Sequence, residues 1–115
     1  MAQSTVKCGS VVLIRYPFTD LSGEKRRPAV VLARSHRGDV IVASIGTHIG
    51  KRSLYEVLLK KDDEDFEKTG LHETSVVDVD RIMTLDLRVA SGELGFMPAR
   101  YYQRVVRKLS ELMEY

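Results

Sequence analysis

The chain has 115 residues, of which 43% are hydrophobic and 30% charged, a composition typical of one soluble globular domain that buries a core without disulfides. No segment approaches the ~18 consecutive apolar residues of a membrane helix. The net charge of +2 hides an asymmetry, because residues 1–60 carry ten Lys and Arg against four Asp and Glu, and residues 61–115 carry eight against twelve. A basic first half is typical of a protein that binds a polyanion, although an unevenly charged solvated surface explains it equally well.

Cys8 is the single cysteine, so an internal disulfide is impossible. Its most economical role is that of a small packing residue. The N-terminus has no apolar run of the kind found in signal peptides. We therefore expect a cytoplasmic protein that does not associate with a membrane.

The chain predicts six short strands, because β-branched and apolar runs are separated by Gly, Pro and polar turns. These runs are residues 11–16, 29–33, 40–45, 54–59, 75–79 and 81–85. Several of them are apolar at consecutive positions, which indicates strands covered on both faces or curled into a barrel. Residues 60–70 predict a charged, solvated connector with room for a turn of helix, and they lack the ligand spacing of a calcium loop. Nothing divides the chain, so we expect one domain over residues 1–115.

The last segment changes to helical periodicity. Pro98 suits the first position of a helix. Apolar residues then recur at helical spacing, at Tyr102, Val105, Val106, Leu109, Leu112 and Met113. Basic residues line the other side (Arg100, Arg104 and Arg107), where a solvated face explains them adequately and contact with nucleic acid is the alternative. The sequence therefore predicts a mainly β fold with a C-terminal amphipathic helix.

Most motifs of enzyme chemistry are absent from the sequence. His36, His48 and His72 are isolated and lack zinc-ligand spacing. The chain has no glycine-rich phosphate loop and no serine nucleophile elbow. We therefore expect no metal and no cofactor. This expectation excludes most hydrolases but leaves ribonucleases, whose nucleophile can be the 2′-hydroxyl of the substrate.

Arg27-Pro28 is the strongest remaining candidate for a functional site. Pro28 is tolerated at the first residue of a strand, and it favours an extended conformation at Arg27. The preceding loop, residues 19–26, is polar and contains Gly23. A guanidinium fixed beneath such a loop suits phosphate, to which it donates two parallel hydrogen bonds. The alternative is an arginine that simply points into solvent at the end of a loop.

Three blocks of the sequence resemble the MazF/PemK family of toxin endoribonucleases from toxin–antitoxin pairs. They are residues 9–32, with Arg27-Pro28, residues 40–45, and residues 70–95, with Asp80-Arg81. The resemblance spans nearly the whole chain. It implies a small SH3-like barrel of the CcdB/PemK type, a homodimer, an acidic antitoxin partner and metal-independent cleavage of single-stranded RNA.

The resemblance also implies catalytic roles. The arginine of the Arg-Pro pair is catalytic in the family and corresponds to Arg27, and a loop glutamate that contributes in some members corresponds to Glu24. A hydroxyl residue usually follows the isoleucine of the second block directly, but here Gly46 stands there and Thr47 comes one residue later. Thr47 serves if Gly46 permits a bulge, whereas Ser44 is a poorer substitute. This departure favours a weak or altered enzyme.

We expect Arg27 to stabilise the added charge of the phosphorane, Thr47 to donate a hydrogen bond to a phosphate oxygen and Glu24 to act as the base. The products would be a 2′,3′-cyclic phosphate and a 5′-hydroxyl. The expected RNA-binding residues are Thr19, Ser22, Lys25, Arg26, Ser44, His48, Lys51 and Arg52. We expect the antitoxin to be a partly disordered acidic segment that occupies the same basic groove.

Three other functions compete with this interpretation. A silent family member would bind RNA or antitoxin without cutting, which Gly46 supports. A gyrase-binding toxin similar to CcdB would need a Trp-Gly-Ile terminus, but this chain has no Trp and ends in Glu114-Tyr115. An SH3-like peptide binder would need an aromatic groove, which three Phe and five Tyr do not favour.

Overall fold

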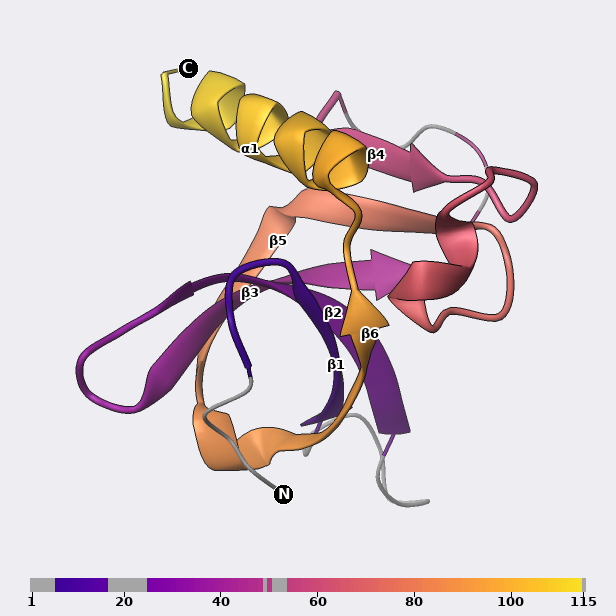
Figure 1. Ribbon diagram of the computed structural model, residues 1–115. Helices are drawn as coiled ribbons and strands as arrows, with labels where there is room; N and C mark the ends of the chain where they lie inside the picture. The colour runs from indigo at the N-terminus through magenta and orange to yellow at the C-terminus, as the bar shows by residue number, and fades with distance from the viewer. Residues whose placement is uncertain (1–5, 17–24, 49, 51–53, 115) are drawn as a thin grey trace.

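The computed structural model describes residues 6–16, 25–48, 50 and 54–114 (Figure 1). Within them the chain forms the strands β1 (Ser10–Tyr16), β2 (Lys25–Arg34), β3 (Asp39–Gly46), β4 (Glu56–Leu59), β5 (Ser75–Asp86) and β6 (Ala90–Phe96). Two 3-10 turns, η2 (Phe66–Thr69) and η3 (Leu87–Val89), and one helix, α1 (Ala99–Met113), complete the fold. Over the described ranges, no helix combines the length and the apolar character needed to cross a membrane.

The strands form one antiparallel sheet in the order β4-β5-β3-β2-β1-β6. The connection η3 joins β5, near one edge, to β6 at the other edge. Three residues bridge at most about 14 Å, whereas four strand spacings in a flat sheet amount to about 19 Å. The sheet therefore has to curl, and Figure 1 shows it curled into a half-barrel with α1 alongside β4 and β5. This confirms the predicted mainly β fold with a terminal helix.

Both faces of the sheet are buried, as the consecutive apolar residues predict. Val30 belongs to a cluster with Tyr101 and Val105, which α1 contributes. Val31, the next residue of β2, belongs to a second cluster on the other face, with residues of other strands and with Val6, which precedes β1. Successive side chains of a strand point to opposite faces, so a run such as 29–31 contributes to both cores.

Some predicted strand boundaries differ from the structure, and β2 begins at Lys25, four residues before the predicted start at residue 29. Residues 75–79 and 81–85 form one strand, β5, because a register shift absorbs the bend: Ala43 of β3 pairs with Ile82, but the next residue, Ser44, pairs with Asp78. β4 begins at Glu56, two residues later than predicted.

The sequence analysis missed β6 altogether. Its sequence, ASGELGF, is interrupted by glycines that weaken strand propensity. One of them has a structural reason. A Cβ atom at Gly95 would lie 2.3 Å from the carbonyl oxygen of Lys68, and one at Gly70, where φ is +76°, would lie 2.1 Å from that of Leu94. The backbones of β6 and η2 therefore cross at a distance that glycine alone permits.

We predict that Gly95→Ala destabilises the fold by about 1–3 kcal/mol or more, because the backbone of η2 must move to make room for the methyl group. Gly92→Ala, in the same strand, is the matched control, since nothing lies within 4 Å of its Cβ position. We expect the control to be neutral or up to about 1 kcal/mol more stable. Urea unfolding of both variants measures the difference, and equal stabilities would contradict the crossing.

The charged connector docks on α1 and is not simply solvated. The hydroxyl of buried Tyr101 donates a hydrogen bond to Asp63. Arg100 donates to Asp65 at 2.8 Å, and its guanidinium lies 4.7 Å from the centre of the Tyr101 ring. Arg100 therefore belongs to a structural network that joins the start of the helix to the loop. Its side chain is exposed, as predicted, but its pairing with Asp65 is not apparent from the sequence.

The same network predicts a loss of stability in alkali. Burial and the hydrogen bond to Asp63 raise the pKa of Tyr101 from 10.0 to about 12. The folded protein therefore keeps the phenol proton where the unfolded chain loses it, so this contribution is complete below pH 10 and is lost as the pH rises to about 12. We expect the free energy of unfolding to fall more steeply over that range in the wild type than in Tyr101→Phe. The unfolding free energy is measured by urea titration at each pH. If it fell equally steeply with pH in both proteins, this assignment would be refuted.

Candidate active site

A pocket of about 260 Å³ lies where β2 and β3 separate. It is lined by three residues of β2 (Arg26, Arg27 and Pro28), three at the end of β3 (Ile45, Gly46 and Thr47) and Ser75 of β5. The pairing of β2 with β3 begins at Ala29 and Ser44. Among the described strands, residues 25–28 therefore pair with β1 alone, and the pocket opens beside them.

Arg27 lies inside β2, not at its beginning. The strand starts at Lys25, so the prediction that Pro28 opens it is wrong. Arg27 pairs with Ile14 and Pro28 with Leu13 on β1. Since the described part of β3 forms no pairing at this level, the missing amide hydrogen of Pro28 costs little, as on an edge strand. The ladder with β1 holds the backbone of Arg27 extended while its side chain is exposed.

Thr47 reaches the same pocket without a bulge at Gly46. Ser44 and Gly46 pair regularly with Asp78 and Val76 of β5, and β3 ends at Gly46. Thr47 follows the end of the strand, so strand alternation no longer restricts its direction. The structure thus brings together Arg27 and Thr47, two of the three predicted catalytic residues. Ser44, the proposed substitute, is not among the described residues that line the pocket.

Two strand neighbours supply cations to the pocket. Successive side chains alternate across a sheet, so Arg26 and Arg27 leave β2 toward opposite faces. Both line the pocket because it lies at the end of the ladder, where the edge of the sheet is open. Ser75 adds a second residue with a hydroxyl group, although its side chain is buried and donates to the carbonyl of Glu73.

The ring of His48 lies beside Gly46, and His48 has a hydrogen-bond partner that the sequence did not reveal. Its Nε2 lies 3.0 Å from Oδ1 and 3.1 Å from Oδ2 of Asp78, thirty residues along the chain. A Cβ atom at Gly46 would be 3.3 Å from Cδ2 of His48, so the imidazole covers the place of the absent side chain. The interpretation of this histidine as isolated is wrong, because the fold joins β3 and β5. Together with Glu56, His48 and Asp78 could hold a metal ion.

Several predicted residues fall outside the described part of the chain. They are Glu24, Thr19, Ser22, Lys51 and Arg52. Lys25 is described as the first residue of β2. The assignments of these residues to RNA cleavage or binding remain predictions.

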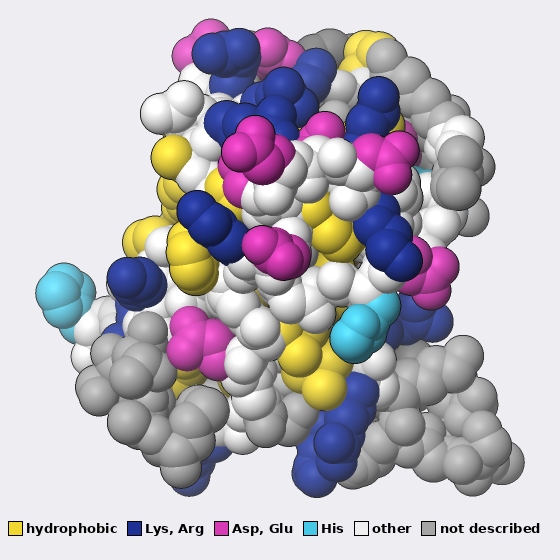
Figure 2. Space-filling model, turned by 45° about the vertical axis from the view of Figure 1, so that its right-hand side comes forward, with side chains coloured by type: hydrophobic (Ala, Val, Ile, Leu, Met, Phe, Trp, Pro, Cys, Tyr) yellow, Lys and Arg dark blue, Asp and Glu magenta, His cyan; other side chains and the backbone are white. Residues whose placement is uncertain are grey.

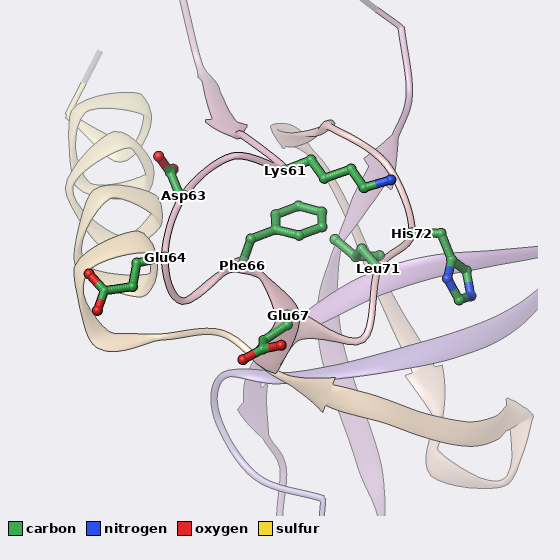
Figure 3. A pocket seen from close by; sticks show the side chains of 7 residues that line it. All are labelled: Lys61, Asp63, Glu64, Phe66, Glu67, Leu71 and His72. Carbon is green, nitrogen blue, oxygen red and sulfur yellow. The ribbon is translucent and has the colours of Figure 1, made fainter.

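A larger pocket, of about 400 Å³, has an unsuitable charge for RNA. Figure 3 shows it around the ring of Phe66, with Asp63, Glu64 and Glu67 beside it and Lys61 and His72 on the far side. Its carboxylates repel phosphate. Figure 2 shows acidic and basic side chains interleaved over the upper part of one face of the molecule. A local grouping such as Arg26 with Arg27 therefore matters more than the net charge.

Comparison with known proteins gives the family and the fold of the chain. The family described as PemK-like, MazF-like toxin of type II toxin-antitoxin system matches residues 7–113. No curated protein matches the chain.

Solved structures match over nearly the whole chain. A MazE–MazF crystal structure from Deinococcus radiodurans is 26% identical, covers 94% of this chain and 95% of that chain, and has a TM-score of 0.71. Two mycobacterial structures support the fold alone. One, an endoribonuclease, is 19% identical with a TM-score of 0.67 and coverages of 94% and 90%. The other, an endoribonuclease in complex with its cognate antitoxin, is 20% identical with a TM-score of 0.69 and coverages of 94% and 94%.

The curled sheet with its terminal helix is thus the MazF-type fold, as the resemblance implied. Since the family matches residues 7–113, which is nearly the whole chain, the chain belongs to the PemK-like, MazF-like toxins of type II toxin–antitoxin systems.

Proposed function

We propose that this toxin is an endoribonuclease that cuts single-stranded RNA without a metal ion, in the pocket at the end of the β2–β3 ladder. One observation carries the proposal: Arg27 and Thr47 line the same pocket, beside Arg26. An arginine and a hydroxyl that share a concavity can bind the same phosphate. Membership of a toxin family, and a similar fold in proteins named as endoribonucleases, support this activity.

The reaction follows from what these side chains can supply. The 2′-hydroxyl of the RNA attacks the adjacent phosphorus, and the bond from phosphorus to the 5′-oxygen of the next nucleotide breaks. The leaving oxygen takes up a proton from solvent. The attack adds negative charge to the phosphoryl oxygens. Arg27 is already fixed on an extended strand, so it stabilises this charge without reorganising. Thr47 donates its hydroxyl hydrogen to a phosphate oxygen.

The base that accepts the 2′-hydroxyl proton is assigned to Glu24. It is the carboxylate nearest to Arg27 along the sequence, three residues away. The products are then a 2′,3′-cyclic phosphate and a 5′-hydroxyl, because the nucleophile comes from the RNA and not from water.

An acidic antitoxin and a second toxin copy complete the proposed assembly. The antitoxin partner is supported by the MazE–MazF complex to which this chain is similar. An acidic segment would neutralise Arg26 and Arg27 at the pocket and thereby exclude RNA. The homodimer rests on family resemblance.

The test of the activity is incubation of the purified protein with long single-stranded RNA in EDTA, followed by mapping of the fragment ends. We expect discrete fragments with cyclic phosphate and 5′-hydroxyl ends. Bound but intact RNA would instead identify a silent family member, which Gly46 favours. Cleavage that requires added metal would contradict the mechanism.

Arg27→Ala should fold normally and cleave RNA about 10²–10³ times more slowly, because the variant lacks one preorganised donor to the transition state. The matched control is Arg37→Ala, since Arg37 is also exposed but lies in the turn between β2 and β3. Single-turnover rates compare the two variants. A wild-type rate for Arg27→Ala would remove this residue from the mechanism.

Arg26→Ala should weaken RNA binding and leave the cleavage site unchanged, because an interaction with phosphate carries no sequence information. We expect the slope of log K against log salt concentration to become shallower by about 0.7, since the variant neutralises one phosphate fewer on a single strand. Binding is measured in the Arg27→Ala background, with and without the change at Arg26, so that cutting is slow during the measurement. An unchanged slope would show that Arg26 does not bind phosphate.

A further inference from the structure

We propose that His48, Glu56 and Asp78 form a binding site for one first-row divalent transition-metal ion, next to the pocket but separate from its chemistry. The three residues come from three segments: His48 follows β3, Glu56 begins β4 and Asp78 lies in β5. Neither the family nor the proposed cleavage reaction requires this site. Its existence therefore does not depend on the proposed function.

The distances suit coordination. One ligand atom from each of the three residues lies within 4.8 Å of the others. Nε2 of His48 is nearly equidistant from both oxygens of Asp78, at 3.0 and 3.1 Å. Bonds of about 2.1 Å at right angles place neighbouring ligand atoms about 3 Å apart, so an ion fits between these atoms with small movements.

The register of the sheet explains why the carboxylates meet. Glu56 pairs directly with Asp78 across β4 and β5, so both side chains leave the same face at adjacent positions. Like charges directly opposite each other destabilise a strand pair. A divalent cation bound between them would offset both negative charges.

Partial burial strengthens the attraction between a bound ion and its ligands. The side chains of His48 and Asp78 are 17% and 13% exposed, which lowers the screening of charge by water and still leaves a path for an ion. Nδ1 of His48 is buried and has no hydrogen-bond partner among the described residues. Nε2 is the ring nitrogen that faces the carboxylate of Asp78, so it is the one that would bind the ion.

The ligand set selects the type of ion. One imidazole and two carboxylates suit Mn²⁺, Co²⁺, Ni²⁺ and Zn²⁺, with Mn²⁺ the weakest of these. Mg²⁺ and Ca²⁺ prefer sites made of oxygen alone. A bound ion would tie the end of β3 to β4 and β5, so we expect it to stabilise the fold.

The experiment titrates EDTA-treated, dialysed full-length protein with ZnCl₂, MnCl₂ or MgCl₂ in a calorimeter, without RNA. The background carries Cys8→Ser, since Cys8 is an exposed thiol that can itself bind zinc. We expect one Zn²⁺ per chain, weaker Mn²⁺ binding, no Mg²⁺ binding and a higher melting temperature with Zn²⁺. Co²⁺ should give a visible absorption band that Zn²⁺ abolishes.

Glu56→Gln and Asp78→Asn keep the shape of each side chain and should each weaken Zn²⁺ binding by about tenfold or more. His72→Ala, which removes an exposed histidine from another loop, is the control and should bind as the background protein does. If Asp78→Asn does not fold, Glu56→Gln and His48→Gln decide the question.

No saturable Zn²⁺ binding to the background protein, or equal binding by Glu56→Gln and the control, would overturn the proposal. Cleavage of RNA in EDTA is measured separately. A nuclease that binds no zinc refutes the metal site alone, and a zinc-binding protein that leaves RNA intact refutes the nuclease alone.

Discussion

The three-residue connection between β5 and β6 is the constraint on which the rest of the structure depends. Because η3 is too short to cross a flat sheet of this order, the sheet curls until the end of β5 meets the start of β6. Curling gives the sheet a concave and a convex face, and both need apolar cover. The two hydrophobic clusters supply it, one within the curl and the other beneath α1.

The candidate active site is a consequence of where strand pairing stops. β2 is longer than its ladder with β3, so residues 25–28 extend beyond Ala29 with β1 as their neighbour among the described strands. Pairing with β1 keeps the backbone of Arg27 extended, and the unpaired end of the β2–β3 ladder leaves space beside it. Thr47, which follows the end of β3, lines that space. A rigid sheet thus positions the side chains, whereas the opening comes from the end of one ladder. This combination is suited to electrostatic catalysis, which depends on donors that are fixed before the substrate arrives.

Charge is organised locally in this molecule. Arg100 is paired with Asp65 in the network that anchors α1, so its charge is engaged in the fold. Arg26 and Arg27 line the pocket at the end of β2. The His48–Asp78 pair with Glu56 forms a third arrangement, in which two carboxylates face one imidazole. These groups differ in their partners and burial, and this difference separates the structural role of Arg100 from the proposed substrate-binding and metal-binding roles of the other two groups.

The sequence by itself determined the mainly β class, the helix at the end and the candidates Arg27 and Thr47, because apolar runs, helical periodicity and family motifs are local patterns. It did not determine β6, where Gly92 and Gly95 conceal a strand, since the reason for Gly95 is its closeness to the carbonyl of Lys68 on another segment. Nor did it reveal that Pro28 lies within a strand, that Arg100 binds Asp65 or that His48 meets Asp78. Only the tertiary structure decided these features, because each depends on contacts between segments that are distant along the chain, such as the 35 positions between Arg100 and Asp65.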